Sequence, residues 1–160
     1  ILFFMINDLI NFLSYDNIYL VVNWGILPFW ILLVINPNHA LTNFLVQSII
    51  VPFILATTYV YVAYNIFIDS NIFDSFELYS GLDGLYSMFS NEAFLLIFWI
   101  HFLTLSLFVG AWIARDSRRY VMPKIITIVS LILTYFTGPV GLFVYWFLRI
   151  FFAKKISFNN

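Results

Sequence analysis

The distribution of basic residues along this chain limits what it can fold into. The sequence has seven Lys and Arg residues, none of them before Arg115, and four of them fall between Arg115 and Lys124. A soluble domain needs charged side chains spread over its surface to stay dispersed in water. A membrane-embedded chain avoids them, because a charge at the centre of a membrane helix costs about 2.5–3.5 kcal/mol. The pattern therefore predicts an integral membrane protein.

Composition supports the same class and excludes several functions. Hydrophobic residues make up 63% of the chain and charged residues 9%, which is far from the composition of ordinary globular or disordered proteins. The net charge of −1 and the absence of a basic stripe predict no nucleic-acid partner. Cysteine is absent, so disulfides, thiolate catalysis and Cys-ligated metal sites are excluded.

Long apolar runs predict the architecture. A spanning helix needs about 20 apolar residues, and the segments that meet this requirement are 18–35, 41–68, 92–114 and 125–152. We therefore expect a single all-α membrane domain over residues 1–160, a bundle of four transmembrane helices. The long connection 69–91 mixes acidic and aromatic residues and is expected to form an interfacial lid. Ser90, directly before Asn91 and Glu92, is the predicted N-cap of the third helix.

The basic cluster also predicts the orientation. Lys and Arg are enriched in cytoplasmic loops, which places loop 115–124 on the cytoplasmic side. Four spans would then put both termini outside, together with Arg149, Lys154 and Lys155, so the rule conflicts with itself in a four-span topology. Enrichment in Ile, Phe and Asn suggests an AT-rich coding sequence and favours a bacterial inner membrane.

Helical periodicity places a stripe of small and polar residues on one face of the predicted fourth helix. Its members recur every three or four residues: Thr127, Ser130, Thr134, Thr137, Gly138, Gly141 and Tyr145. Small residues allow close approach of membrane helices, so a packing seam with a kink at Pro139 is one interpretation and a ligand-lining face is the other. Pro28 and Pro52 fall near the middle of the first two predicted helices, and three kinks at similar depth can open a pocket.

One ionisable residue falls deep inside a predicted span. His101 lies about nine residues past Glu92, hence ~14 Å into the layer, and such residues are candidate functional groups. It is the predicted catalytic acid, base or hydrogen-bond donor; the alternative is a neutral histidine bonded to a hydroxyl of a neighbouring helix. Residues expected to line a ligand are Asn23, Trp24, Tyr61, Tyr64, Glu92, Thr104, Phe108, Thr134, Thr137 and Tyr145. An interfacial aromatic belt accounts equally well for the Trp and Tyr residues among them. No metal site is expected, because His39 lies in the first loop, far from His101.

Several short motifs in a fixed order resemble the ABA4-like membrane protein family (domain of unknown function 4281). They are Leu27-Pro28-Phe29-Trp30, Asn36-Pro37-Asn38, Met88-Phe89-Ser90-Asn91-Glu92, Trp99-Ile100-His101, Leu107-Phe108-Val109-Gly110, Arg115-Asp116 and Gly138-Pro139-Val140-Gly141. The resemblance extends from about residue 23 to residue 149.

The resemblance implies a protein that handles a carotenoid or apocarotenoid, since plant members of the family are implicated in converting violaxanthin to neoxanthin. That conversion opens an epoxide and forms an allene by proton loss, so the expected enzyme is an isomerase without a redox cofactor, and His101 matches the family's histidine. Polyene modification or cleavage is the other reaction considered. Ser106 stands where the family commonly has an Asp, which favours the alternative of a non-catalytic pigment- or lipid-binding protein or a scaffold subunit. The expected partners are membrane lipid, a lipophilic polyene and further chains of an oligomer or membrane complex.

Overall fold

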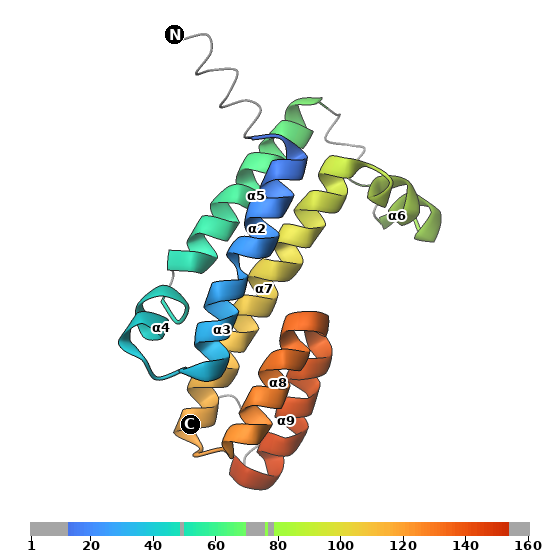
Figure 1. Ribbon diagram of the computed structural model, residues 1–160. Helices are drawn as coiled ribbons and strands as arrows, with labels where there is room; N and C mark the ends of the chain where they lie inside the picture. Colours follow the sequence, from blue (N-terminus) through green and yellow to red (C-terminus); the bar gives the residue numbers. More distant parts are fainter. Residues whose placement is uncertain (1–12, 49, 70–75, 77–78, 154–160) are drawn as a thin grey trace, which may run out of the picture. The chain divides into compact units, whose positions relative to one another are not determined.

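The described part of the chain is helical. The computed structural model describes residues 13–48, 50–69, 76 and 79–153, and all regular secondary structure within these ranges is helix (Figure 1). The described residues divide into two compact units, one within Ile1–Ile26 and Ile54–His101 and the other within Leu27–Phe53 and Phe102–Asn160. The predicted all-α class is confirmed for the described residues.

Within the described residues, three helical segments are long and apolar enough to cross a membrane: Tyr15–Ile35, Ala40–Ile68 and Glu92–Arg119. They overlap the first three predicted spans. The first contains α2 (Tyr15–Gly25) and α3 (Leu27–Ile35), the second contains α4 (Ala40–Leu45) and α5 (Ile50–Asp69), and the third is the unbroken helix α7 (Glu92–Arg119). Helix α7 contributes to both units and extends past the predicted end at residue 114.

The three prolines expected to kink continuous helices instead lie at the starts of new helices. Pro28 is the second residue of α3, Pro52 the third of α5, and Pro139 the first of α9 (Pro139–Ala153). Proline lacks an N–H and fixes φ near −65°, so the first turn of a helix accommodates it, whereas a helix interior does not. At Pro139 the expected kink is instead a turn between two helices, whereas Pro28 follows a one-residue break at Ile26 within the apolar helical segment Tyr15–Ile35.

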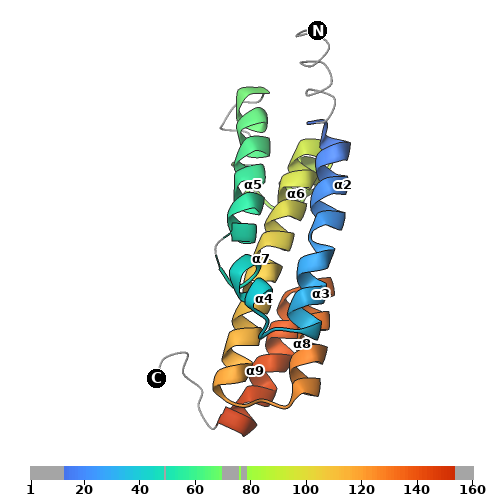
Figure 2. The same cartoon turned by 60° about the vertical axis from the view of Figure 1, so that its left-hand side comes forward.

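The prediction of one spanning helix over 125–152 was also wrong. This segment is a helical hairpin, in which α8 (Lys124–Thr137) and α9 pack side by side (Figures 1 and 2). Gly138 makes the turn with φ +59°, a conformation that glycine adopts without a Cβ penalty, and Pro139 then starts the return helix. Helix α8 has 14 residues, hence a length of ~21 Å, which is short of the ~30 Å hydrocarbon core.

The predicted small and polar stripe is the contact between the two arms of this hairpin. Ser130 and Thr134 are buried on α8, and Gly141 is buried on α9. A Cβ at Gly141 would overlap the backbone of Thr134 and the carbonyl oxygen of Ser130, so only glycine permits this approach. The packing interpretation of the stripe is thus confirmed for these residues.

In the other unit, α2 lies beside the first turns of α7. The indole N–H of Trp99 donates to Oδ1 of Asn23 at 3.3 Å, and the ring of Tyr19 lies 6.4 Å from that of Trp99. Helix α6 (Leu82–Phe89) falls within the predicted lid, and Phe89 packs against Phe98 with ring centroids 4.5 Å apart. Residues 70–75 and 77–78 of the lid lie outside the described ranges, so its closing role stays a prediction.

The start of α7 is capped by the neighbour of the predicted residue. Oδ1 of Asn91 accepts from the backbone N–H of Phe94 at 3.1 Å. The hydroxyl of Ser90 instead donates to the Tyr86 carbonyl at 2.9 Å, at the end of α6. Asn91 is therefore the N-cap, since its side chain satisfies a free N–H of the first helical turn.

Candidate ligand-binding groove

Two arginines at the end of α7 form hydrogen bonds with the connection between α3 and α5. Nη1 of Arg118 donates to the Pro37 carbonyl at 2.8 Å and to Oδ1 of Asn38 at 3.0 Å, and its Nη2 donates to Oε1 of Gln47 at 2.5 Å. Nη1 of Arg115 donates to the Gln47 carbonyl at 2.9 Å. These acceptors are neutral, so they orient the guanidinium groups without cancelling their charge.

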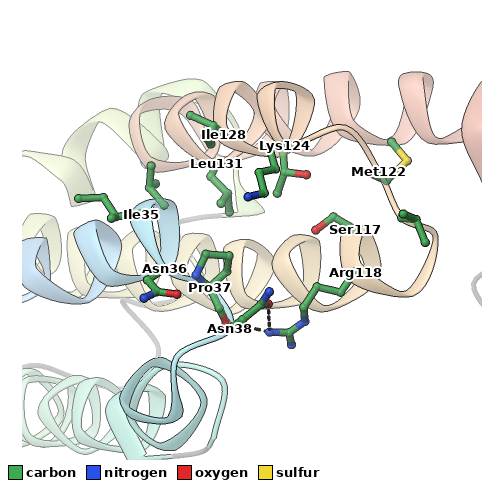
Figure 3. A pocket seen from close by; sticks show the side chains of 13 residues that line it. Ile35, Asn36, Pro37, Asn38, Ser117, Arg118, Met122, Lys124, Ile128 and Leu131 are labelled. Atoms are coloured by element: carbon green, nitrogen blue, oxygen red, sulfur yellow. Dashed lines mark hydrogen bonds between the residues drawn. The ribbon is translucent and has the colours of Figure 1, made fainter.

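A cavity of about 460 Å³ lies between this connection, the end of α7 and the start of α8, and its lining combines apolar residues with polar and charged ones. Its size falls within the range of small-molecule sites. Lys124 and Leu131 extend from α8 and Ser117 from α7 toward the space between the helices, and Arg118 reaches Asn38 at its edge (Figure 3). The lining residues are Val34, Ile35, Asn36, Pro37, Asn38, Ser117, Arg118, Val121, Met122, Lys124, Thr127, Ile128 and Leu131.

An apolar cavity of about 270 Å³ continues from it along α3 and α8. The two cavities share Val34, Ile35 and Leu131, so we call the pair the α3–α8 groove. Trp30 and Tyr135 form an aromatic wall, with ring centroids 5.5 Å apart in an edge-on arrangement. The other residues lining this end are Leu27, Ile31, Ile132 and Phe136. The groove therefore carries polar and charged side chains at one end and is apolar along the rest.

Gly110 on α7 makes room for the aromatic wall of the groove. A Cβ at this position would lie 2.6 Å from Cη2 of Trp30 and 3.2 Å from Cδ2 of Leu33. Because such contacts are too short, any larger residue would displace the indole ring. The glycine in the Leu107-Phe108-Val109-Gly110 motif thus positions Trp30.

A buried ionic cluster joins α7 to α9 in the same unit. Oδ2 of Asp116 accepts from Nε of Arg149 at 2.6 Å and from the hydroxyl of Tyr145 at 2.7 Å, and the guanidinium carbon of Arg149 lies 4.5 Å from the Tyr120 ring centre. Arg149 is 1% exposed and Asp116 9%. We call these residues the Asp116 cluster. The sequence interpretation missed it, although an arginine inside an apolar run was a signal that a buried partner exists.

Some of the predicted ligand-binding residues lie together in the first unit. Tyr61 and Glu92 line one cavity of about 510 Å³ with Leu13, Ser14, Tyr15, Asp16 and Asn65. Asn23 is bonded to Trp99 as described above, and Trp24 and Tyr64 are exposed. The cavity brings together two of the residues expected to contact a ligand, and their role in binding stays a prediction.

His101 does not have the surroundings expected of it. Its side chain is exposed, with its ring centroid 6.1 Å from that of Tyr59 and 6.2 Å from that of Phe98, and it lines none of the three cavities described here. The imidazole is therefore not buried as the sequence interpretation expected. The buried residues around it on α7 are Ile97, Ile100, Leu103, Ser106 and Leu107. His101 follows Ile100 directly and therefore points about 100° away from it on the helix.

The predicted ligand-binding residues of the second unit are not assembled around one space. Thr134 and Tyr145 are buried between helices, Thr104 is half-buried, and Phe108 and Thr137 are exposed. Sequence reasoning missed the groove because its walls are ordinary apolar residues; Asn36-Pro37-Asn38 and Lys124 were its visible signals. Within the described residues, no group of three His, Cys, Asp or Glu side chains is placed to share a metal ion. His39 caps α4, its Nδ1 accepting from the Leu41 N–H at 3.2 Å.

These features define a helical protein with long apolar segments compatible with membrane insertion and an elongated groove that is polar at one end. The chain belongs to the ABA4-like family: residues 17–145 match the family described as ABA DEFICIENT 4-like. The resemblance seen in the sequence motifs is thereby confirmed.

The chain is similar to Protein ABA DEFICIENT 4, chloroplastic, of Arabidopsis thaliana, with 30% identity over 105 residues that cover 64% of this chain and 48% of the relative. The chain thus spans about half the length of that protein. No solved structure matches. The relative is chloroplastic by name, and the predicted bacterial inner membrane stays a prediction for this chain.

Proposed function

We propose that the protein is an integral membrane protein that binds and acts on a carotenoid or apocarotenoid, with one end of this ligand held in the α3–α8 groove. The supporting observation is the order of surfaces along the groove, where the Trp30–Tyr135 wall continues into a polar end formed by Asn36, Asn38 and Ser117. A polyene with an oxygenated ring has the matching sequence of surfaces, an apolar conjugated chain followed by a polar end. Aromatic side chains contribute a large apolar contact area, which suits a planar conjugated chain.

The dimensions of the groove favour partial burial of the ligand. Helix α3 has nine residues, which corresponds to ~14 Å, less than half of the ~30 Å hydrocarbon core. The groove therefore accommodates one ring end and the neighbouring polyene, and a full-length carotenoid extends beyond it along lipid. An apocarotenoid, which is shorter, fits a larger share of its length.

We further propose a topology of three spans and one re-entrant hairpin, with loop 115–124 cytoplasmic. Because Arg149 is bonded to Asp116, the returning end of α9 lies beside the end of α7. Arg149 then shares one membrane side with the basic cluster 115–124, which satisfies the positive-inside rule and removes the conflict of a four-span topology. The polar end of the groove would face the cytoplasm.

The binding proposal is tested by filling the groove. Val34 lines both cavities, so V34W should occlude it, whereas V129W adds the same bulk to an exposed position of α8 outside the groove. Each variant is expressed in a carotenoid-producing host, purified in detergent and examined by visible absorption. We expect pigment with the parent protein and V129W and at least a tenfold loss with V34W at unchanged helix content. Equal pigment in both variants would overturn the assignment of the groove.

Isomerase-type proton transfer at His101 is the second proposal. It is supported by the family resemblance and by the placement of the imidazole beside the rings of Tyr59 and Phe98. The alternative of binding without chemistry is supported by the lining of the groove, which contains neither histidine nor carboxylate among the described residues. H101A and H101Q in membranes supplied with a xanthophyll distinguish them. Loss of product in both variants with retained pigment supports proton transfer, and turnover equal to the parent protein removes His101 from the mechanism.

A further inference from the structure

We infer that the end group selected by the α3–α8 groove is anionic, so that the preferred ligand is a polyene carboxylate, an acidic apocarotenoid, rather than a neutral xanthophyll. This inference rests on the proposed binding of a polyene in the groove. It goes beyond that proposal because it specifies the chemistry of the ligand's polar end.

The charge of the polar cavity is the first supporting observation. Arg118 and Lys124 line it, and no Asp or Glu is among its lining residues. The hydrogen bonds of Arg118 to Pro37, Asn38 and Gln47 all use neutral acceptors, so its positive charge is not cancelled by them. The ammonium group of Lys124 reaches into the space between α8 and α7 (Figure 3).

The neighbouring carboxylate does not neutralise this charge. Asp116 directly precedes Ser117 in sequence, but both of its oxygens bond to Arg149 and one also accepts from Tyr145. Its negative charge is therefore compensated on the α9 side of helix α7. The cavity keeps an excess of positive charge that an anionic ligand would balance.

The surroundings of the cavity increase the expected difference in affinity between an acid and an alcohol. A carboxylate makes charge-assisted hydrogen bonds to Lys and Arg that are about twice as strong as those between neutral groups. Electrostatic attraction is also larger beside an apolar wall than in bulk water, because the local dielectric constant is lower. A tenfold preference requires a difference of only about 1.4 kcal/mol. We therefore expect at least a tenfold tighter binding of the acid.

All-trans retinoic acid and all-trans retinol are suitable probes, since they share a ring and polyene and differ in the end group. The protein is placed in nanodiscs of phosphatidylcholine, and binding is followed by quenching of tryptophan fluorescence, to which Trp30 in the groove wall contributes. The parent protein should bind the acid at least tenfold more tightly than the alcohol. K124M should lose most of this preference, and K124R should retain it.

Arg119 provides the matched control. It is exposed on α7, one residue from Arg118, and lies outside the lining of the cavity. R119M removes one positive charge, as K124M does, at the other end of the short connection between α7 and α8, and it should leave the ratio of acid to alcohol affinity unchanged. A second measurement needs no substitution. Raising the salt concentration should reduce the ratio of the parent protein's affinities for the acid and the alcohol, because ions screen an exposed ammonium group.

The outcomes separate this inference from the binding proposal. Equal affinities for acid and alcohol in the parent protein would overturn the anionic preference and leave polyene binding intact. Failure of both probes to quench, together with no pigment in the carotenoid-producing host, would overturn the binding proposal itself. Displacement of retinoic acid by phosphatidylglycerol added to the nanodisc would assign the positive end to membrane phospholipid and also overturn the inference.

Discussion

The Asp116 cluster yields the sharpest prediction about stability. R149M would remove the cation that bonds to Asp116 and leave a carboxylate that is 9% exposed with only the Tyr145 hydroxyl as partner. Breaking a buried ion pair from one side costs about 3–5 kcal/mol, because the remaining charge is left without compensation. Y145F removes one hydrogen bond and keeps the ion pair, so a loss of about 1–3 kcal/mol is expected.

A double variant identifies the physical cause. D116L with R149M removes both charges together, and buried pairs replaced in this way are often neutral in their effect on stability. It should therefore be more stable than R149M alone, although R149M carries fewer changes. This reversal would not occur if Arg149 contributed only packing.

Unfolding by sodium dodecyl sulfate in mixed micelles, followed by tryptophan fluorescence, measures these differences. Trp112 lies 5.7 Å from the Tyr145 ring and Trp146 lies 6.0 Å from the Arg149 guanidinium carbon, so the signal reports on the cluster itself. The reasoning is refuted if R149M lowers the free energy of unfolding by less than about 1 kcal/mol, or if the double variant is no more stable than R149M.

Two further predictions concern the α8–α9 hairpin. The sequence contains no cysteine, so the single-cysteine variants V121C and A153C can each be labelled with a membrane-impermeant maleimide. We expect the reagent to label both cysteines from the same side of the membrane. Labelling from opposite sides would show that residues 125–152 cross the membrane as a single fourth span. G141A should destabilise the protein by about 1–3 kcal/mol, since its Cβ would overlap the α8 backbone. Its control is G25A, where a Cβ meets nothing within 4 Å, and equal stability of the two variants in the same micelle assay would contradict the close packing.

Sequence patterns predicted the class of fold well because composition and charge placement report directly on the solvent that surrounds the chain. The three long apolar segments were found for this reason. The buried stripe of Ser130, Thr134 and Gly141 was found from its helical periodicity. The stripe was assigned to one helix although it belongs to two that face each other.

The remaining errors share a physical cause. Hydropathy is insensitive to a tight turn when the helices on both sides are equally apolar, so the Gly138–Pro139 pair was interpreted as a kink although a Gly-Pro step favours a turn. The position of His101 along the chain indicated its depth but not its direction, which is set by Ile100 and Leu103 turning toward neighbouring helices. The groove could not be found from spacing, because its two walls come from α3 and α8, which are far apart in sequence.

The link between Asp116 and Arg149 also constrains how the protein is made. The two residues are 33 positions apart, so the carboxylate leaves the ribosome well before the cation that neutralises it. Elements made first generally begin to fold first during synthesis. Until α9 has been synthesised, the Asp116 carboxylate has no cation beside it, so we expect it to stay in contact with water. In the proposed membrane topology, we therefore expect the α8–α9 hairpin to pack against α7 last, after the preceding apolar segments have been inserted.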